Sequence, residues 1–301
     1  MAKFDLSIIV ISYNTKEITK KCLDSIIESL KDSPITYEIV VVDNDSRDGS
    51  VELLKDYQKK LGDKFSLILN NENAGFGKAN NQAVKVARSD YILFLNSDAF
   101  ALEDAISKLF NFYRQNENKI HFLGGKLFNE DMSDQPSAAP FFTLPIVFMV
   151  MFTRSDYWGL TRYSPNKFKK VDWVSGACIL TKKEIFEKVG GFDEGVFMYM
   201  EEVDLLYRAR KLDYSTYFYP DAKFIHVGFA SSGKSRSYPV TQVFRGLLYF
   251  YRKHRSYSSF FALKLMLKLK AGILIFLGRL LRSQYLTQTY EKAYKLIKMD
   301  R

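Results

Sequence analysis

Two groups of side chains in this sequence have types and spacing suited to chemistry. In the first, Asp98 follows the apolar run at residues 91–95 after Asn96 and Ser97. A short apolar run bounded by polar residues predicts a buried strand, and the carboxyl end of such a strand is where open α/β sheets bind ligands. An aspartate there can also cap the next helix, so Asp98 alone leaves both interpretations open.

The second group is the acidic cluster Glu201, Glu202 and Asp204, which opens a segment with apolar residues at helical spacing. Acidic side chains favour the first turn of a helix because they interact with the helix dipole. Asp204 can also pair with Arg208 one turn later. The two adjacent glutamates lie beside apolar and aromatic residues, which raise the pKa of a carboxyl group and suit it to act as a general base.

His226 is a third candidate, at the end of the apolar run 224–226. A lone histidine is more often structural. At a strand end that faces the same edge as Asp98, however, it suits contact with a metal ion or a phosphate.

The cysteines exclude some classes of site. Cys22 and Cys178 each lie in an apolar periodic segment, and no Cys/His cluster accompanies them. We therefore expect neither a zinc site nor a disulfide framework. We expect the protein to work in a reducing compartment. The sequence enters a strand almost at once, which predicts no signal peptide.

The elements that must position these residues alternate between strands and helices. Strands are expected at residues 6–11, 38–42, 65–69, 91–95 and 123–127. Helices are expected at residues 15–30, 50–61 and 103–115, and a glycine-bearing turn at 73–81 is expected to run into a helix that ends near residue 88. This alternation predicts a parallel sheet covered by helices on both faces. Polar segments follow the strands at residues 12–14, 43–46, 73–77 and 96–98. Right-handed crossovers would gather them along one edge, as a binding crevice.

Charge is distributed unevenly along the 301 residues, a length that suits one large α/β domain and an extension. Residues 234–301 carry 15 Lys and Arg against 2 Asp and Glu, a larger surplus than the +10 net charge of the whole chain. The remainder is therefore mildly acidic. This asymmetry predicts an anionic partner surface. We expect a membrane rather than nucleic acid, because no nucleic-acid motif accompanies the charge.

The pattern from about residue 238 onward is helical. Four basic residues fall within about 60° of one another on a helix of 3.6 residues per turn: Lys264, Lys268, Arg279 and Arg282. Five apolar residues are expected to enter the interfacial zone of a bilayer: Phe260, Phe261, Leu263, Leu267 and Phe276. Packing on the catalytic domain, or on a second subunit to give a homodimer, is the alternative.

The apolar stretch 139–152 is too short to span a bilayer. Two interpretations stay open for it. It is either buried core or a flap that touches lipid or an apolar acceptor.

Six motifs together resemble inverting family 2 glycosyltransferases of the GT-A fold, and most of all the bacterial rhamnosyltransferase branch. They are Ile-Ser-Tyr-Asn (11–14), Val-Asp-Asn-Asp-Ser-x-Asp-Gly-Ser (42–50), Asn-x-Gly-Phe-Gly-x-Ala-Asn-Asn (73–81), Leu-Asn-Ser-Asp (95–98), Trp-Val-Ser-Gly-Ala (173–177) and Gly-Gly-Phe-Asp-Glu (190–194), followed by the acidic cluster. The resemblance implies an α/β, Rossmann-like, mostly parallel sheet over residues 1–237. Its nucleotide-sugar half would be about 1–120 and its acceptor half about 121–237. The charge and the helical pattern, rather than the resemblance, predict a basic amphipathic helical tail at 238–301.

The resemblance also implies residue roles. The nucleotide sugar would be held by Ser12, Tyr13, Asn14, Asp43, Asn73, Gly75, Lys78, Asn80, Asn96 and Ser97. Asp98 would bind Mg²⁺ or Mn²⁺ with help from His226, and Trp173 and Gly176 would border the acceptor. Glu202 stands where the family has its catalytic base, usually the aspartate of a Glu-Asp pair. This chain has Glu201-Glu202 instead, so Glu201 stays an alternative base.

The expected reaction is transfer of a sugar, rhamnose from dTDP-rhamnose first of all, to a lipid-linked or polysaccharide acceptor. We expect the protein in the cytoplasm, peripheral on the inner face of the cell membrane. Three alternatives are weighed. One is transfer of another hexose from a UDP-sugar. A sugar-nucleotide pyrophosphorylase is disfavoured because Ser12-Tyr13-Asn14 stands where that class usually has a glycine-rich basic loop. A non-catalytic, membrane-associated sugar-nucleotide-binding protein is disfavoured by the intact acidic cluster.

Overall fold

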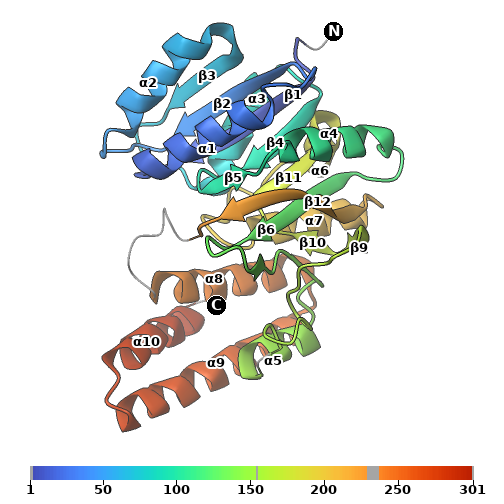
Figure 1. The fold of residues 1–301 in the computed structure, drawn as a ribbon. Helices are drawn as coiled ribbons and strands as arrows, with labels where there is room; N and C mark the ends of the chain where they lie inside the picture. Colours follow the sequence, from blue (N-terminus) through green and yellow to red (C-terminus); the bar gives the residue numbers. More distant parts are fainter. Residues whose placement is uncertain (1–2, 154, 229–236, 300–301) are drawn as a thin grey trace.

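The computed structural model describes residues 3–153, 155–228 and 237–299 (Figure 1). The first half contains β1 (Leu6–Ser12), α1 (Lys16–Ser29), β2 (Tyr37–Asp43), α2 (Ser50–Leu61), a 3₁₀ turn (Gly62–Lys64), β3 (Phe65–Leu69), α3 (Phe76–Val86), β4 (Tyr91–Leu95), β5 (Ala99–Ala101), α4 (Ala105–Gln115) and β6 (Phe122–Phe128). The strands and helices expected there are all present, and their ends lie within the one or two residues by which assignments ordinarily differ.

The second half contains shorter strands and a series of helices. These are β7 (Asp134–Gln135), β8 (Ala138–Ala139), α5 (Leu144–Phe152), β9 (Lys169–Val171), β10 (Trp173–Val174), β11 (Cys178–Lys182), α6 (Lys183–Val189), α7 (Glu201–Lys211), β12 (Thr216–His226), α8 (Ser237–His254), α9 (Tyr257–Leu280) and α10 (Gln284–Met299). The expected helix that begins at the acidic cluster is α7.

One mixed sheet, in the order β3-β2-β1-β4-β11-β6-β12-β5, forms the centre of the molecule. β1 pairs in parallel with β2 and β4, and β6 pairs in parallel with β12. β11 runs antiparallel between β4 and β6, so its first residues lie beside the end of β4. The backbone N–H of Asn96 accordingly donates to Ala177 O at 3.0 Å. β1, β2, β3, β4, β6 and β12 share one direction, so the sheet is mostly parallel, as expected. β5, β7, β9 and β11 run the opposite way, and β11 brings the Trp173–Ala177 motif to the edge where β1 and β4 end.

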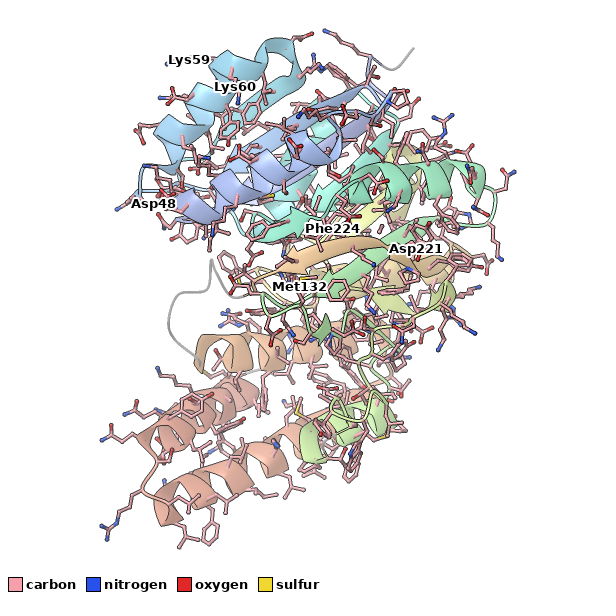
Figure 2. All side chains as sticks on the ribbon, viewed as in Figure 1. Asp48, Lys59, Lys60, Met132, Asp221 and Phe224 are labelled. Carbon is pink, nitrogen blue, oxygen red and sulfur yellow. The ribbon has the colours of Figure 1, made fainter. Side chains whose placement is uncertain are left out.

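Helices cover both faces of the sheet. The side chains of each strand point alternately to the two faces, and on each face they form an apolar core with the helices. Leu6, Ile8 and Val10 face one core, together with side chains of α1, α2 and α4. Ile9 faces the other, together with side chains of α3, α6 and α7. Figure 2 shows the exposed Lys59 pointing outward from α2. Burial of strands on both faces is what a parallel sheet requires.

The three C-terminal helices extend the second core. Figure 1 shows α8 between the sheet and α9, and α9 farthest from the sheet. Phe260, Leu263 and Leu267 of α9 are buried in this packing, so the expectation that they enter a bilayer is wrong. Arg282 lies beyond the end of α9 and does not continue its basic side. In the described ranges, no helix combines the length and apolarity needed to cross a membrane.

A buried cluster of charges ties α8 to α7. The Asp204 carboxylate is 1% exposed. It lies 2.7 Å from Arg208 Nε, 2.9 Å from Lys253 Nζ and 2.6 Å from His254 Nε2. Burial alone would raise the pKa of Asp204, but the hydrogen bond with His254, the charge of Arg208 and the hydrogen bond from Lys253 lower it well below its usual range. The expected pair with Arg208 is confirmed, and it is part of a larger contact with the tail.

We predict that Asp204→Ala lowers the free energy of unfolding by about 3 kcal/mol, since removing one partner of a buried ion pair leaves the others uncompensated. Urea unfolding at neutral pH measures this. Glu184→Ala removes the exposed i,i+4 partner of Lys188 and should leave the midpoint within error. Equal midpoints for the two variants would show that the cluster does not stabilise the fold.

Candidate active site

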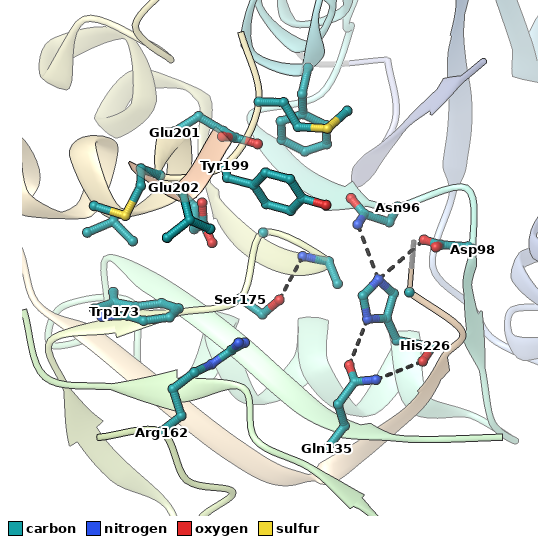
Figure 3. Close-up of a pocket in the computed structure, with 18 of the residues that line it drawn as sticks. Asn96, Asp98, Gln135, Arg162, Trp173, Ser175, Tyr199, Glu201, Glu202 and His226 are labelled. Carbon is teal, nitrogen blue, oxygen red and sulfur yellow. Dashed lines mark hydrogen bonds and ion pairs between the residues drawn. The ribbon is translucent and has the colours of Figure 1, made fainter. Parts of the chain in front are cut away.

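A cavity of about 710 Å³ opens at the edge where β1 and β4 end (Figure 3). It brings together residues from both halves of the chain. Those expected from the sequence that line it are Tyr13, Asn73, Gly75, Asn96, Ser97, Asp98, Trp173, Gly176, Glu201, Glu202 and His226. Asp98 and Glu202 therefore share one cavity, although they are more than a hundred residues apart in the chain.

The polar segments after the first strands hold one another at this edge, as expected. The Asn14 N–H donates to Ser46 Oγ at 2.8 Å, and Asn44 Nδ2 donates to Gly75 O at 3.4 Å. Gly75 has φ +82°, and a Cβ there would lie 2.9 Å from Phe197 O. Only glycine fits this turn, because other residues rarely adopt a positive φ and the backbone of another loop lies against it.

Five expected donor-binding residues lie outside the cavity lining. Asn14 and Lys78 are exposed, and Asn80 is buried with its Nδ2 bonded to Phe76 O at 2.9 Å. Ser12 and Asp43 are buried register partners at the ends of β1 and β2. Ser12 Oγ and Asp43 Oδ2 have no hydrogen-bond partner within the described part of the chain. Their roles in donor binding stay predictions.

His226 reaches the cavity because the end of β12 pairs with β5, directly after Asp98. Gln135 Nε2 donates to His226 O at 2.9 Å, which fixes the Gln135 amide and makes its Oε1 the acceptor for His226 Nδ1 at 2.7 Å. In the neutral ring Nε2 then carries the lone pair. This atom lies 3.3 Å from Asp98 Oδ1 and 3.4 Å from Asn96 Nδ2 (Figure 3).

This arrangement fits a divalent cation. An imidazole whose far nitrogen is held by a hydrogen bond, beside a carboxylate, is a frequent pair of metal ligands. Asn96 Oδ1 is buried without a hydrogen-bond partner among the described residues. Within the same residues, no group of three His, Cys, Asp or Glu side chains could hold a metal on its own. A cation here would therefore need oxygens from a ligand or from water, as Mg²⁺ ordinarily does.

Glu201 and Glu202 reach the cavity from the first turn of α7 (Figure 3). Burial and then the charge of Glu202 raise the pKa of Glu201 well above its usual range. Burial also raises the pKa of Glu202, although the charge of Arg162 and the backbone N–H of Gly176 act in the opposite direction. Glu201 Oε2 is buried without a hydrogen-bond partner in the part of the chain described. The pair thus offers a carboxyl group that can take up a proton.

The chain is strained just before this pair. Tyr199 and Met200 both have positive φ, +66° and +77°, which non-glycine residues rarely adopt. Such strain persists only where the surroundings enforce it, and it is frequent at functional sites. Here α8 supplies the support, since a Cβ at Gly246 would lie 2.6 Å from Met200 Cγ. The close packing of α8 therefore helps to position Glu201.

Several cavity residues were not expected from the sequence. Gln135 orients His226, Tyr199 lines the cavity next to Met200, and Arg162 projects into it with its guanidinium 5.6 Å from the centre of the Trp173 ring (Figure 3). None of them lies in a motif with recognisable spacing. Only the tertiary structure shows that the guanidinium of Arg162 lies near Trp173, an aromatic residue of one of the motifs.

Residues 7–190 match the family described as Glycosyl transferase family 2. This is more than half of the chain, and it includes the polar segments after β1, β2 and β4. The chain belongs to glycosyltransferase family 2. The expected family is thereby confirmed.

Two family relatives show the range of similarity. The chain is 30% identical to the low-salt glycan biosynthesis hexosyltransferase Agl10 of Haloferax volcanii, over 69% of this chain and 62% of that protein. It is 28% identical to the rhamnosyltransferase WbbL of Escherichia coli, over 73% of this chain and 82% of that protein. The match thus spans less than two thirds of Agl10 but most of WbbL.

A solved structure confirms the fold. The crystal structure of GalNAc-T7 with UDP, GalNAc and Mn²⁺ superposes with a TM-score of 0.57 at 14% sequence identity, covering 74% of this chain and 44% of that one. At this identity the likeness concerns the fold alone. It agrees with the GT-A-like arrangement of one mostly parallel sheet between helices.

We predict that Glu201→Gln stabilises the protein at neutral pH. A carboxyl whose pKa is raised on folding contributes stability that is fully present below its unfolded pKa and is lost as the pH rises through the folded pKa. Glutamine stays neutral and avoids that loss. The urea midpoint of Glu201→Gln should therefore exceed that of the parent at pH 7.5, and the gain should vanish near pH 4. A lower midpoint at pH 7.5 would show that the Glu201 carboxylate is stabilised in a way the structure does not reveal.

Proposed function

We propose that this family 2 enzyme is an inverting hexosyltransferase that moves rhamnose from dTDP-rhamnose onto a lipid-linked or polysaccharide acceptor. The supporting observation is that one cavity holds Asp98 and His226 together with a pair of buried glutamates. The similarity to the rhamnosyltransferase WbbL favours rhamnose. Transfer of another hexose from a UDP-sugar is the second candidate, because GalNAc-T7 was crystallised with UDP and Agl10 is a hexosyltransferase.

In this proposal the donor lies at the edge formed by the first strands. Asp43 Oδ2 and Ser12 Oγ are buried hydrogen-bonding atoms whose partners would come from the base and ribose. Tyr13, Asn73 and Gly75 line the cavity next to them. Asn14, Lys78, Asn80, Asn96 and Ser97 complete the proposed donor site.

Asp98 and His226 would hold Mg²⁺ or Mn²⁺. A divalent cation would neutralise the negative charge that develops on a departing diphosphate. Gln135 keeps His226 Nε2 turned toward Asp98, since it binds both the ring Nδ1 and the backbone oxygen of His226. The carboxylate and the imidazole would thus be ready without rearrangement.

Glu202 would act as general base on the acceptor. Its carboxylate takes the proton of the acceptor hydroxyl while that oxygen bonds to the anomeric carbon and the bond to the diphosphate breaks. The diphosphate leaves with the electron pair, and the configuration inverts. Trp173 and Gly176, which line the cavity beside Glu202, would border the acceptor. Glu201 is the alternative base, since burial and the charge of Glu202 raise its pKa.

We predict that Glu202→Gln reduces sugar transfer by about 10²–10⁴-fold, the usual contribution of a general base, with donor affinity unchanged. Asp98→Ala should instead weaken donor binding when Mn²⁺ is present. Transfer from a panel of dTDP- and UDP-sugars, with calorimetry for donor affinity, measures both.

Glu201→Gln distinguishes the two candidate bases, because a larger loss of transfer in Glu201→Gln than in Glu202→Gln would assign the base to Glu201. A Glu202→Gln variant that turns over normally would remove Glu202 from the reaction. A parent protein that neither transfers nor hydrolyses any nucleotide sugar would favour a non-catalytic role.

We further propose that the enzyme is peripheral on the inner face of the cell membrane and binds anionic lipid through α9. Residues at a spacing of three or four form an exposed apolar row opposite the buried face of this helix: Phe261, Leu265, Leu269, Ile273, Phe276 and Leu280. Lys264, Lys268 and Arg279 flank this row on one side. Such a face suits a bilayer of anionic lipid. A homodimer through the same face would bring the basic flanks of two copies together.

We predict that Leu269→Glu weakens sedimentation with phosphatidylglycerol vesicles by at least about 10-fold, since burying one leucine contributes about 1.5–3 kcal/mol. Leu69→Glu, at an exposed leucine of β3, is the control and should bind like the parent. If Leu269→Glu binds vesicles normally but dissociates a dimer in light scattering, a second copy rather than lipid covers the row.

A further inference from the structure

One wall of the cavity that holds Glu201 and Glu202 is apolar. Its side chains come from α5, from the loop before it and from α8: Phe142, Val147, Val150, Met151, Val243 and Leu247. The ring of Phe142 lies 6.0 Å from that of Trp173, and Gly246 of α8 packs on Met200, next to Glu201. The apolar wall therefore borders the glutamate side of the cavity.

The chemistry of this wall does not suit a sugar or a nucleotide. Both need hydrogen-bonding partners in a buried site, and these six side chains offer none. A cavity lined by valine, leucine, methionine and phenylalanine suits a hydrocarbon chain, which loses no hydrogen bonds on entering it. The wall thus calls for an apolar group on the ligand that approaches Glu202.

Arg162 supplies a positive charge to the same cavity. Arg162 lines the cavity, stacks on Trp173 and lowers the pKa of Glu202 through its charge. A guanidinium is well matched to phosphate oxygens, which it can bind with two parallel hydrogen bonds. Phosphate is the group that joins a hydrocarbon chain to a sugar in a lipid-linked glycan.

The apolar wall also continues toward the surface proposed to meet the bilayer. α5 places Val147 and Met151 in the cavity lining, while Phe148 of the same helix is 51% exposed. The loop after α5 exposes Tyr157 and Trp158, at 85% and 64%. Tyrosine and tryptophan are the residues enriched where membranes meet water.

α5 is in turn fastened to α9, since Lys270 Nζ donates a hydrogen bond to Met151 O. One short helix therefore forms both the cavity wall and part of the exposed apolar surface. A chain anchored in a bilayer would reach the cavity along it.

We propose that the wall formed by α5 and α8 binds the hydrocarbon chain of a lipid phosphate that carries the acceptor sugar, with Arg162 at the phosphate. This assignment rests on the proposed transferase function and selects the lipid-linked acceptor over a soluble polysaccharide. The hydrocarbon lies against Val147, Val150 and Leu247, and the sugar hydroxyl is then presented to Glu202.

Binding of two alkyl phosphates to the full chain tests this proposal. The probes are decyl phosphate and butyl phosphate, both kept below the concentration at which they aggregate. The chain has two tryptophans. The Trp158→Phe variant is used throughout, so that the fluorescence emission comes from Trp173 in the cavity and reports binding there. Decyl phosphate should bind at least about 10-fold more tightly than butyl phosphate, because each additional buried methylene adds to affinity.

Variants test where the hydrocarbon chain and the phosphate of the probes bind. Val150→Asp, in the cavity wall, should abolish the preference for the longer chain, whereas Phe148→Asp, on the exposed side of the same helix, should keep it. Val243→Asp on α8 repeats the test if Val150→Asp fails to fold. Arg162→Gln should weaken both phosphates by a similar factor of about 10 and leave their ratio unchanged.

Equal affinity for the two probes, or equal effects of Val150→Asp and Phe148→Asp, would overturn the proposal. These measurements use no sugar transfer, so they are separate from the test of the proposed function. A protein that prefers decyl phosphate but transfers no sugar would refute the function and retain the site. A protein that transfers sugar but binds both phosphates equally would do the reverse.

Discussion

The buried carboxylate of Asp204 connects α7 to α8, and both helices contribute side chains to the cavity. It belongs to the first turn of α7, whose Glu201 and Glu202 line the cavity, and it binds Lys253 and His254 at the end of α8. Lys253 also pairs with Asp193, which accepts a hydrogen bond from Tyr249 at 2.8 Å. The C-terminal helices are thereby fixed against the catalytic part. Buried apolar side chains of α8, among them Phe244, Leu247 and Phe250, add to this contact.

Three carboxylates within four residues have opposite electrostatic environments. Asp204 is surrounded by cationic groups that hold its pKa low, so it stays charged and structural. Glu201 and Glu202 face the cavity, where burial raises their pKa. A helix separates these roles simply by rotation, because successive side chains point in different directions. The same turn of α7 therefore supplies both an anchor for the fold and a candidate proton acceptor.

The site combines residues that local motifs predict with residues that they do not. Asp98, Asn96 and Gly75 follow strands in motifs with clear spacing, and the structure places them in the cavity. Gln135 and Arg162 lie in irregular segments, and their importance comes only from what they touch. Ser12 and Asp43 are expected beside the donor; they are buried, and Ser12 Oγ and Asp43 Oδ2 have no hydrogen-bond partner among the described residues, so that expectation stays a prediction. Conversely, Phe260 and Leu263 were expected at a membrane but are buried.

The sequence by itself determined the order of strands and helices, the polar segments at the strand ends and the acidic start of α7, because these depend on local periodicity and on near neighbours in the chain. The tertiary structure decided the antiparallel direction of β11, which carries Gly176 to the edge where β4 ends. It also decided which face of α9 is buried and that α8 completes the cavity wall. Strand direction and helix facing depend on contacts between distant segments, and an apolar residue has the same local pattern whether it packs on a neighbouring helix, lines a cavity or faces outward.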